Sequence, residues 1–189
     1  MVIKRVIVIC YKDNPLLVTK ILTNSLLISY GIRVDTTLYL VTGKGSCIEF
    51  RGKELRGLNP DVRSAMGFLK AILRRKVKVP GVYYLNKLPR LRCEVLYVLR
   101  NGEGSLSSDL FHELARNPSS ACLLALCGNE VINELVSGVR YAYMRFLSPQ
   151  YLMCLDQLIT VFHYVIDRYG GAYIRRAGRK GVTHIPPMR

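Results

Sequence analysis

Three turns in the second half of the chain have residue types that could hold a flat heterocyclic ligand. They are LRNGEG at residues 99–104, LCGNE at residues 126–130 and FLSPQYL at residues 146–152. Two of them contain glycine, which lets a ligand approach the backbone closely. In an open α/β sheet, ligands bind beyond the carboxyl ends of the strands. If the turns meet in space, their main-chain amides could bind such a ligand; taken singly, they are typical of ordinary loops.

Other kinds of chemistry have no matching motif in the sequence. The chain has no G-x-G-x-x-G, no G-x-x-x-x-G-K-[ST] and no G-x-S-x-G, so dinucleotide, P-loop and hydrolase sites are not indicated. His112, His163 and His184 are far apart in sequence, and the apolar neighbours of His163 favour a structural role. We expect no metal site, and the sequence assigns no catalytic residue.

The six cysteines lie mostly in apolar runs and form no C-x-x-C pair; they are at positions 10, 47, 93, 122, 127 and 154. Zinc sites usually need close pairs of this kind. We interpret the cysteines as reduced, buried thiols that pack as small hydrophobic side chains. Cys122 and Cys127 could pair, but a strand would place their side chains on opposite faces.

Net charge is the strongest compositional signal. The 28 Lys and Arg residues exceed the 13 Asp and Glu residues, which gives a formal charge of +15. Such a field attracts polyanions, so nucleic acid is the expected partner, with a basic surface that only aids solubility as the alternative. The length of 189 residues and an apolar content of 50% favour one globular domain. Without a signal peptide pattern or a long apolar run, a soluble, cytoplasmic protein is expected.

Apolar runs alternate with helical patterns along the chain. Strands are predicted at residues 2–10, 35–41, 47–50, 82–85, 95–99, 122–127 and 141–147, of which the second and third suit a hairpin. Helices are predicted at residues 16–30 (ended by Gly31), 59–73 (with Asn59 as N-cap), 106–115, 131–136 and 148–168. This alternation indicates an α/β fold with a mostly parallel sheet flanked by helices.

The end of the chain differs in composition from the rest. Residues 168–189 are basic, contain Gly and Pro, and include no acidic residue. We therefore divide the chain into a single domain at residues 1–167 and a basic C-terminal tail at residues 168–189. The tail is predicted to be a mobile arm in the absence of its partner.

The segments GIRVDTTLYLV (31–41), CIEFRGKELRGLNPDVRSAMGFLKAIL (47–73) and PGVYY (80–84) resemble the archaeal tRNA pseudouridine-54 N1-methyltransferases. That family has an Ile-Arg-x-Asp pattern, an F-x-G-x-E-L turn and a P-D-E-R-S helix start. The matching residues are Ile32, Arg33, Asp35, Phe50, Gly52, Glu54, Leu55, Pro60, Asp61, Arg63 and Ser64. The three turns described above resemble later family motifs in the same order.

This family belongs to the SPOUT class, so the resemblance implies a C-terminal trefoil knot, over about residues 95–167, and S-adenosylmethionine as cofactor. Backbone groups of the three turns would hold the adenine, near Leu99, Leu126, Gly128, Leu147 and Leu152. The implied reaction is N1-methylation of a flipped-out pseudouridine in tRNA. Glu54 and Glu103 are candidate proton acceptors, although each also suits an ordinary turn.

The resemblance also implies where RNA binds. Phosphate or loop contacts are expected from the basic turn and its flanks: Arg33, Arg51, Lys53, Arg56 and Arg63. Arg63 could equally pair with Asp35 or Asp61. Sequence-independent affinity would come from Arg74, Arg75 and Lys76 and from Arg175, Arg176, Arg179 and Lys180 in the tail. SPOUT proteins usually form homodimers, and the wide apolar face of residues 148–168 fits such an interface.

Several positions depart from the family pattern, mostly in the cofactor half. Asn129 stands where the family usually has Asp, a glycine is missing from GNEVINEL, and the stretch between Tyr84 and Val95 is short. Two alternatives therefore stay open. One is a non-catalytic RNA-binding SPOUT paralogue, and the other is a SPOUT methyltransferase acting on rRNA or another base.

Overall fold

The computed structural model describes residues 3–11, 13–29, 31–42, 45–91, 93–104, 119–128, 133, 143–147, 155–170, 172–176 and 182–186. The helices are α1 (Pro15–Leu26), α2 (Val62–Leu73) and α5 (Leu155–Gly170). The strands are β1 (Lys4–Cys10), β2 (Leu27–Ile28), β3 (Gly31–Arg33), β4 (Thr36–Val41), β5 (Cys47–Arg51), β6 (Val82–Leu85), β7 (Val95–Gly104), β8 (Ser120–Ala125), β9 (Tyr143–Leu147), β10 (Ala172–Arg176) and β11 (Thr183–Ile185).

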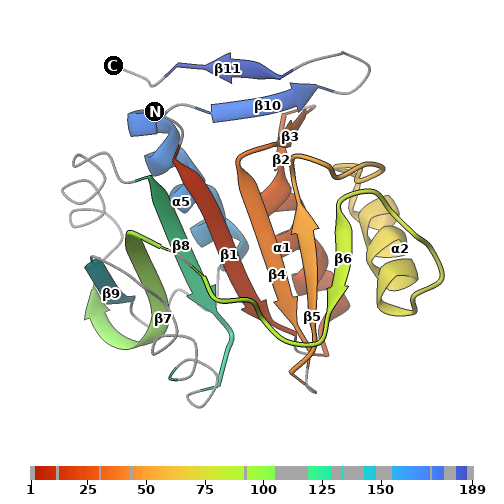
Figure 1. Ribbon diagram of the computed structural model, residues 1–189, viewed down its shortest axis with the longest axis horizontal. Helices are drawn as coiled ribbons and strands as arrows, with labels where there is room; N and C mark the ends of the chain where they lie inside the picture. The colour runs from red at the N-terminus through yellow and green to blue at the C-terminus, as the bar shows by residue number, and fades with distance from the viewer. Residues whose placement is uncertain are drawn as a thin grey trace.

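A seven-stranded sheet forms the centre of the molecule, with the strand order β6-β5-β4-β1-β8-β7-β9 (Figure 1). Strands β4, β1, β8, β7 and β9 run parallel to one another, while β5 is antiparallel to both β4 and β6. The predicted α/β fold with a mostly parallel sheet is confirmed, as is the predicted hairpin of β4 and β5.

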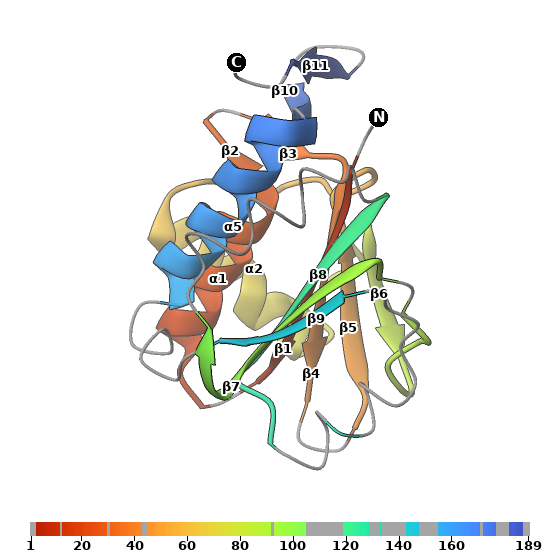
Figure 2. The same cartoon turned by 90° about the vertical axis from the view of Figure 1, so that its left-hand side faces the viewer.

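The described helices cover one face of this sheet, with α1 between α2 and α5 (Figure 2). Alternate residues of the central strands, such as Ile7, Leu38 and Leu123, are buried against them in one hydrophobic core. The core also contains Phe162 of α5, whose ring meets that of Tyr97 edge to face. Within the part of the chain that the structure describes, no helix is long and apolar enough to cross a membrane.

The other face of the sheet carries a second apolar cluster. It includes Val8, Leu96 and Leu124, which point away from the helices because side chains alternate along a strand. Leu88 and Leu91 pack against this cluster from the segment that joins β6 to β7. That segment crosses the sheet, so both faces of the central strands are buried, as expected for a parallel sheet.

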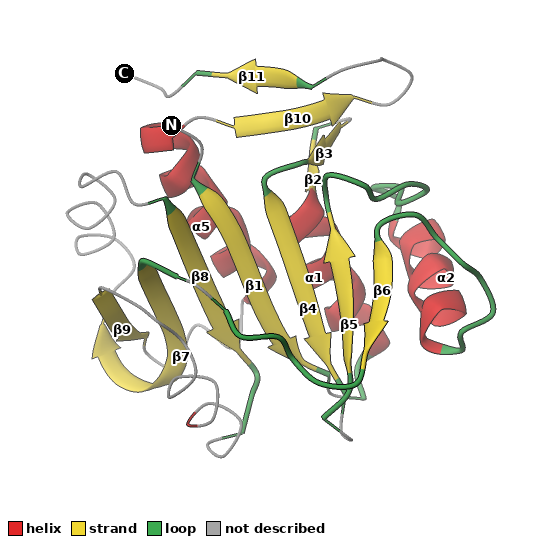
Figure 3. Cartoon of the chain, viewed as in Figure 1, coloured by secondary structure: helices red, strands yellow, loops and turns green. Residues whose placement is uncertain are grey.

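A second, four-stranded sheet has the order β11-β10-β3-β2 (Figure 3). Strand β10 pairs antiparallel with β3, and β11 pairs antiparallel with β10. The prediction of a mobile tail is therefore wrong for residues 172–176 and 183–185, which form strands. Composition could not reveal this, because their partner lies about 140 residues earlier in the chain.

Two predicted helix boundaries are also wrong. The first helix ends at Leu26, and Gly31 belongs to β3, because Leu27 and Ile28 pair with β3 across a turn in which Ser29 has φ 49°. The second helix starts at Val62 with Asp61, not Asn59, as its N-cap. The Asp61 side chain accepts a hydrogen bond from the Ser64 backbone N–H at 2.9 Å. The predictions for residues 106–115, 131–136 and 148–154 lie outside the described residues, apart from Asn133.

Candidate active site

Predicted cofactor residues lie on neighbouring strands, although the turn predicted at residues 99–104 is wrong, because these residues form the second half of β7. Strands β8, β7 and β9 are parallel neighbours, so their carboxyl ends meet at one edge of the sheet. Leu99 pairs with Leu147, and Val98 pairs with Leu124, two residues before Leu126. Four predicted cofactor positions are thus brought to this edge, namely Leu99, Leu126, Gly128 and Leu147. Leu152 lies outside the described residues, and the cofactor role of all five stays a prediction.

The turn after β8 has an unusual backbone. Leu126 has φ 62°, in the left-handed region that side chains rarely adopt, and it directly follows the buried end of β8. Gly128 is exposed, and a Cβ added there would meet no atom within 4 Å. Packing of the described residues therefore does not require a glycine at this position. Because glycine has no side chain, the backbone amide and carbonyl groups at Gly128 stay accessible beyond the carboxyl end of β8. This suits a ligand held by main-chain groups.

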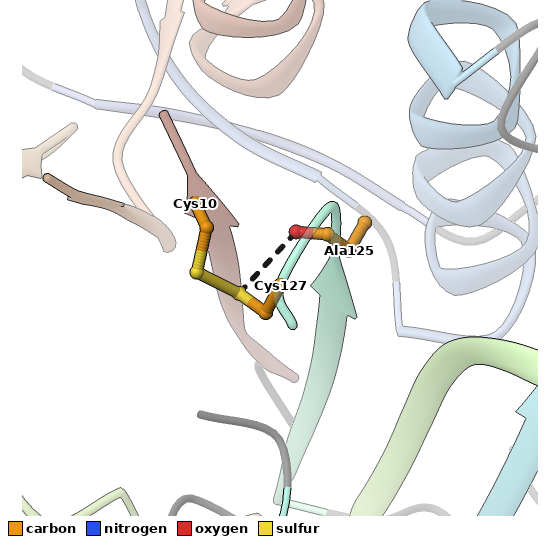
Figure 4. The surroundings of a disulfide bond; sticks show 3 residues. All are labelled: Cys10, Ala125 and Cys127. Atoms are coloured by element: carbon orange, nitrogen blue, oxygen red, sulfur yellow. Dashed lines mark hydrogen bonds between the residues drawn. A yellow bond between two sulfur atoms is a disulfide. The ribbon is translucent and has the colours of Figure 1, made fainter. Parts of the chain in front are cut away.

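A disulfide fixes this turn to the neighbouring strand (Figure 4). Cys127 is bonded to Cys10 at the end of β1, with Cα atoms 4.9 Å apart. The Cys127 Sγ also lies 3.5 Å from the carbonyl oxygen of Ala125. The carboxyl end of β1 and the turn after β8 are thereby joined covalently at the edge that carries the predicted cofactor turns.

The prediction that all cysteines are reduced is wrong. A second disulfide joins Cys93 to Cys122, with Cα atoms 5.8 Å apart. Cys122 and Cys127 are therefore bonded to other cysteines and not to each other. Sequence spacing gave no signal, because the partners are 117 and 29 residues apart. Cys47 is a buried free thiol, and burial, followed by the nearby Glu49 carboxylate, raises its pKa to about 12. Cys154 lies outside the described residues.

Arg33, a predicted RNA contact, is buried in an ion cluster. Its two terminal nitrogens donate to the Asp167 carboxylate at 3.0 and 2.8 Å, and its side chain is 7% exposed. Arg5 donates to the same carboxylate at 2.6 Å and lies 3.4 Å from Asp35. Because its guanidinium is committed to Asp167, Arg33 stabilises the fold and is not a surface phosphate contact. Asp35 is paired with Arg5, and the alternative that Arg63 pairs with Asp35 or Asp61 stays a prediction.

His163 lies beside this ion cluster and has the structural role that its sequence context favours. It is 2% exposed, and its Nδ1 accepts a hydrogen bond from Arg5 at 3.1 Å. An Nδ1 that accepts places the imidazole proton on Nε2. Burial, together with the charges of Arg33 and Arg5, lowers the pKa of His163 well below its ordinary value. The imidazole is therefore neutral, as its cationic surroundings require.

The remaining predicted RNA contacts lie at the surface. Lys53, Arg56 and Arg63 are exposed, and the Arg51 side chain is 43% exposed. Arg51 lies 2.9 Å from the Glu49 carboxylate, and its guanidinium stacks 4.3 Å above the centre of the Tyr83 ring. Its charge is thus partly compensated. The RNA roles of these four residues stay predictions.

A cluster of polar side chains that sequence reasoning missed lies behind Arg51. Glu49 is 5% exposed and accepts a hydrogen bond from the Tyr39 hydroxyl at 3.0 Å. Burial and the Glu49 carboxylate raise the pKa of Tyr39 above its ordinary value. The Tyr83 hydroxyl donates to Glu54, a candidate proton acceptor whose side chain is 42% exposed. Glu54 thus stabilises its turn, and the Glu103 side chain lies outside the described residues.

Arg75 and Tyr84 form a second stacked pair, at the end of α2. The Arg75 guanidinium lies 5.0 Å from the centre of the Tyr84 ring, and Arg75 has φ 53°. A side chain in this left-handed conformation costs roughly 1–2 kcal/mol. An exposed cation–π contact contributes only about 0.5–1 kcal/mol. The pair therefore does no more than offset the backbone strain that Arg75 introduces.

The other basic residues predicted to bind RNA lie at the end of α2 and in the C-terminal tail. Arg74, Arg75 and Lys76 are exposed at the end of α2. Arg175 and Arg176 lie in β10, opposite Ile32 and Gly31 of β3, and Arg179 and Lys180 are outside the described residues. Within the described ranges, no group of three or more His, Cys, Asp or Glu side chains could hold a metal ion.

The basic turn and the cofactor edge lie at opposite ends of the central strands. Arg51 pairs with Thr37 at the amino end of β4, whereas Leu126 and Gly128 follow the carboxyl end of β8 and Leu147 ends β9. A strand of six residues is about 20 Å long. The basic turn therefore does not border the cofactor edge within a single chain.

Comparisons with known proteins support the resemblance over part of the chain. No protein-family model matches it. Three curated proteins named tRNA (pseudouridine(54)-N(1))-methyltransferase are similar: one from Natronomonas pharaonis is 34% identical over 68 residues, one from Haloferax volcanii 37% over 54 and one from Haloarcula marismortui 32% over 59. These matches cover 36%, 29% and 31% of this chain.

The matched part is also limited in the relatives, of whose lengths it covers 34%, 27% and 30%. The chain thus spans about a third of the length of the curated relatives that it matches. A crystal structure of Archaeoglobus fulgidus Nep1 bound to S-adenosylhomocysteine is similar, with a TM-score of 0.43 and 15% identity, over 76% of this chain and 68% of that chain. The predicted resemblance to this methyltransferase family is confirmed by the three curated relatives.

Proposed function

We propose that this chain, which is related over part of its length to archaeal tRNA pseudouridine-54 N1-methyltransferases, is an RNA methyltransferase that uses S-adenosylmethionine. The sequence similarity to three curated enzymes of that name carries the proposal. The finer proposal is N1-methylation of pseudouridine 54 in tRNA by a SPOUT fold with a trefoil knot. The net charge of +15 is consistent with an RNA substrate.

The cofactor would bind at the edge formed by the carboxyl ends of β8, β7 and β9. Gly128 supports this location, because its exposed backbone has open space where a side chain would be. The left-handed Leu126 turns the chain just before it, and the disulfide of Cys127 to Cys10 holds the turn in place. Backbone amides and carbonyls fixed in this way can hold an adenine ring without charged side chains.

When bound, S-adenosylmethionine supplies a methyl group on a sulfonium whose positive charge disappears on transfer, so the leaving group needs no acid. The protein then has to hold the target nitrogen in line with the methyl group, and N1 gives up its proton to a carboxylate or to water as the bond to the methyl group forms. Flipping the nucleotide out of its stack would bring N1 of pseudouridine to the edge. Lys53, Arg56 and Arg63, which are exposed, would hold the RNA phosphates.

The proposed enzyme acts as a homodimer. The basic turn and the cofactor edge of one chain lie at opposite ends of β4 and β8, too far apart for one bound nucleotide to reach both. A two-fold dimer could place the basic turn of one chain beside the cofactor edge of its partner. The apolar side of α5 does not form this interface, because Leu158, Phe162 and Val165 are buried within the chain.

Isothermal titration calorimetry with S-adenosylmethionine tests the cofactor site. We expect saturable binding by the wild-type protein and at least about a 10-fold loss of affinity in Gly128→Val, because a branched side chain would block the bare backbone. The melting temperature of this variant should stay unchanged, since the space at Gly128 is open. Absence of binding at millimolar cofactor would instead favour the non-catalytic RNA-binding paralogue.

Nucleoside mass spectrometry tests the substrate. A tRNA transcript with pseudouridine at position 54 should gain one methyl group, and the same transcript with uridine should gain none. Methylation of rRNA fragments, or of another tRNA base, would move the assignment to the alternative SPOUT methyltransferase. Cofactor binding without methylation of any of these RNAs would contradict the proposed substrate class.

A further inference from the structure

The end of α2 has an arginine where helices usually have glycine. The Arg75 N–H donates to the Ile72 carbonyl at 2.8 Å, and the Lys76 N–H donates to the Ala71 carbonyl at 2.9 Å. This pair of hydrogen bonds is the Schellman motif, whose left-handed residue is most often glycine. Arg75 occupies that position with φ 53°. Glycine would form the same turn without strain, so the fold alone does not explain this arginine.

The position directs the Arg75 guanidinium over the ring of Tyr84, at 5.0 Å. The ring itself is held in place, because the Tyr84 hydroxyl donates to the Ile72 carbonyl at 2.8 Å. Tyr84 is nevertheless 37% exposed, and Arg75 is exposed. Among the described residues, no carboxylate lies within ion-pair distance of Arg75. The structure therefore presents an immobilised, solvent-facing pair of a guanidinium and an aromatic ring.

The surroundings of this pair carry one sign of charge only. Residues 62–93 include nine Lys or Arg and no Asp or Glu. Lys70, Arg74, Lys76 and Lys78 are exposed on the last turns of α2 and the loop that follows. That loop leads to β6, which is the edge strand of the seven-stranded sheet, beside α2 (Figure 3). The surface beside this edge strand is thus positively charged and favours a polyanion.

We infer that Arg75 and Tyr84 form a stacking platform for an unpaired base of RNA, with the basic residues around it holding the phosphates. Aromatic rings and guanidinium planes are the groups on which proteins stack unpaired bases. The carboxylates of an acidic protein could pair with the cations, but they would not stack on the aromatic ring and the guanidinium as a planar base can. The choice of RNA as the polyanion rests on the proposed function. The platform is separate from the Arg51–Tyr83 pair, because Tyr83 and Tyr84 point to opposite faces of β6.

The test is tRNA binding by Arg75 variants, measured by fluorescence anisotropy without cofactor. Arg75→Gly should raise the dissociation constant about 10-fold, as expected for the loss of one stacked base. Its melting temperature should stay the same or rise by about 2–4 °C, because glycine relieves the strained helix end. Arg75→Lys keeps the charge but loses the planar group, and it should weaken binding almost as much.

One further variant tests the ring, and another serves as a control. Tyr84→Leu removes the ring and should weaken binding about as much as Arg75→Gly, whereas Lys20→Gln removes an exposed cation on α1 and should bind within about 2-fold of wild type. Weak binding by Arg75→Gly with normal binding by Arg75→Lys would overturn the stacking role and leave a phosphate contact. A lower melting temperature with unchanged tRNA affinity would overturn the inference altogether and leave a structural arginine or a protein-binding one.

The outcome is independent of the proposed catalytic activity. A protein that fails to bind S-adenosylmethionine, but whose tRNA affinity depends on Arg75, would contradict the proposed methyltransferase and leave the platform standing. A protein that methylates tRNA, with an affinity for tRNA that is unchanged in Arg75→Gly, would contradict the platform alone.

Discussion

Asp167 is the carboxylate that two buried arginines, Arg5 and Arg33, share. It accepts hydrogen bonds from Arg5 and Arg33, and so ties β1 and β3 to the last turn of α5. The Ile-Arg-x-Asp pattern of the related methyltransferases thus includes, in this chain, an arginine that works inside the fold. A surface role for Arg33 looked plausible from sequence because a charge count does not reveal burial, and Asp167 lies 134 residues away.

Replacing Asp167 with Asn should lower the free energy of unfolding by about 3–5 kcal/mol, because buried Arg33 loses its counter-charge and Arg5 is left with Asp35. Urea denaturation at pH 7 measures this change. Asp156→Asn is the matched control: Asp156 lies 4.0 Å from Lys20 at a partly exposed site, so its loss should cost about 1 kcal/mol or less. Similar losses in both variants would contradict the structural importance of the cluster.

His163 should make stability depend on pH. In the unfolded chain it binds a proton as the pH falls below about 6.5, whereas in the folded chain the lowered pKa keeps it neutral. Acid therefore favours the unfolded state, and the free energy of unfolding should fall by about 1.4 kcal/mol between pH 7.5 and 5.5. Urea denaturation across this range would show it. His163→Gln should reduce the slope, and an unchanged slope would assign the effect to other groups.

At the scale of elements, the strands of the central sheet could be predicted from sequence, because short apolar runs rich in β-branched residues, such as residues 2–10, are typical of buried strands. The parallel order of β7, β8 and β9 also explains why their carboxyl ends point to the same side of the sheet. Short strands such as Leu27–Ile28 could not be predicted, since helical periodicity continues through them. The disulfides and the β10–β3 pairing join distant parts of the chain, and local patterns do not encode such contacts.

Because Gly52 has no side chain, the turn after β5 can lie against the backbone at the end of β3. A Cβ at this position would lie 1.9 Å from the carbonyl oxygen of Arg33, so Gly52→Ala should destabilise the protein by about 3 kcal/mol or more. Gly67 is the control, because it lies within α2 and a Cβ there would meet nothing within 4 Å. Gly67→Ala should stabilise the protein by about 0.5–1 kcal/mol. Thermal unfolding of both variants would compare them, and equal effects would contradict the close approach at Gly52.

The Cys10–Cys127 disulfide should stabilise both the fold and the turn after β8. Cys127→Ser should lower the free energy of unfolding by about 2–5 kcal/mol, since the bond closes a long loop. If the turn holds the cofactor, affinity for S-adenosylmethionine should fall as well. Peptide mapping without reductant would establish the bond, and urea denaturation its effect. Unchanged stability on replacing Cys127 would contradict this role.

At the scale of the whole molecule, charge and geometry together favour a shared site. The basic turn near Arg51 and the edge near Leu126 face away from each other along the sheet. The sequence predicted both regions but not their separation, because spacing along the chain says nothing about which end of a sheet a turn occupies. Two chains are the simplest way to bring a basic turn and a cofactor edge together.

Mixing two inactive variants should therefore restore activity. Gly128→Val should prevent cofactor binding, and a triple substitution of Lys53, Arg56 and Arg63 by Gln removes the positive charges of the basic turn. After the subunits exchange, half of the dimers should be mixed, and about a quarter of wild-type activity should return, because each mixed dimer has one intact site. A methylation assay on tRNA would measure this recovery. No recovery despite demonstrated subunit exchange would show that each site lies within one chain.

The pairing of Ile174 with Arg33 has a consequence for biosynthesis. Strand β3 leaves the ribosome well before its neighbour β10, which is made about 140 residues later. Asp167, the counter-ion of Arg33, is also made after this long interval. Until then the nascent chain carries Arg33 without this carboxylate, and β3 has no partner on its β10 side, whereas Arg5 can already pair with Asp35. The emergence of the first helices is therefore not enough for this sheet and its ion cluster to form, because both wait for the synthesis of residues 167–176.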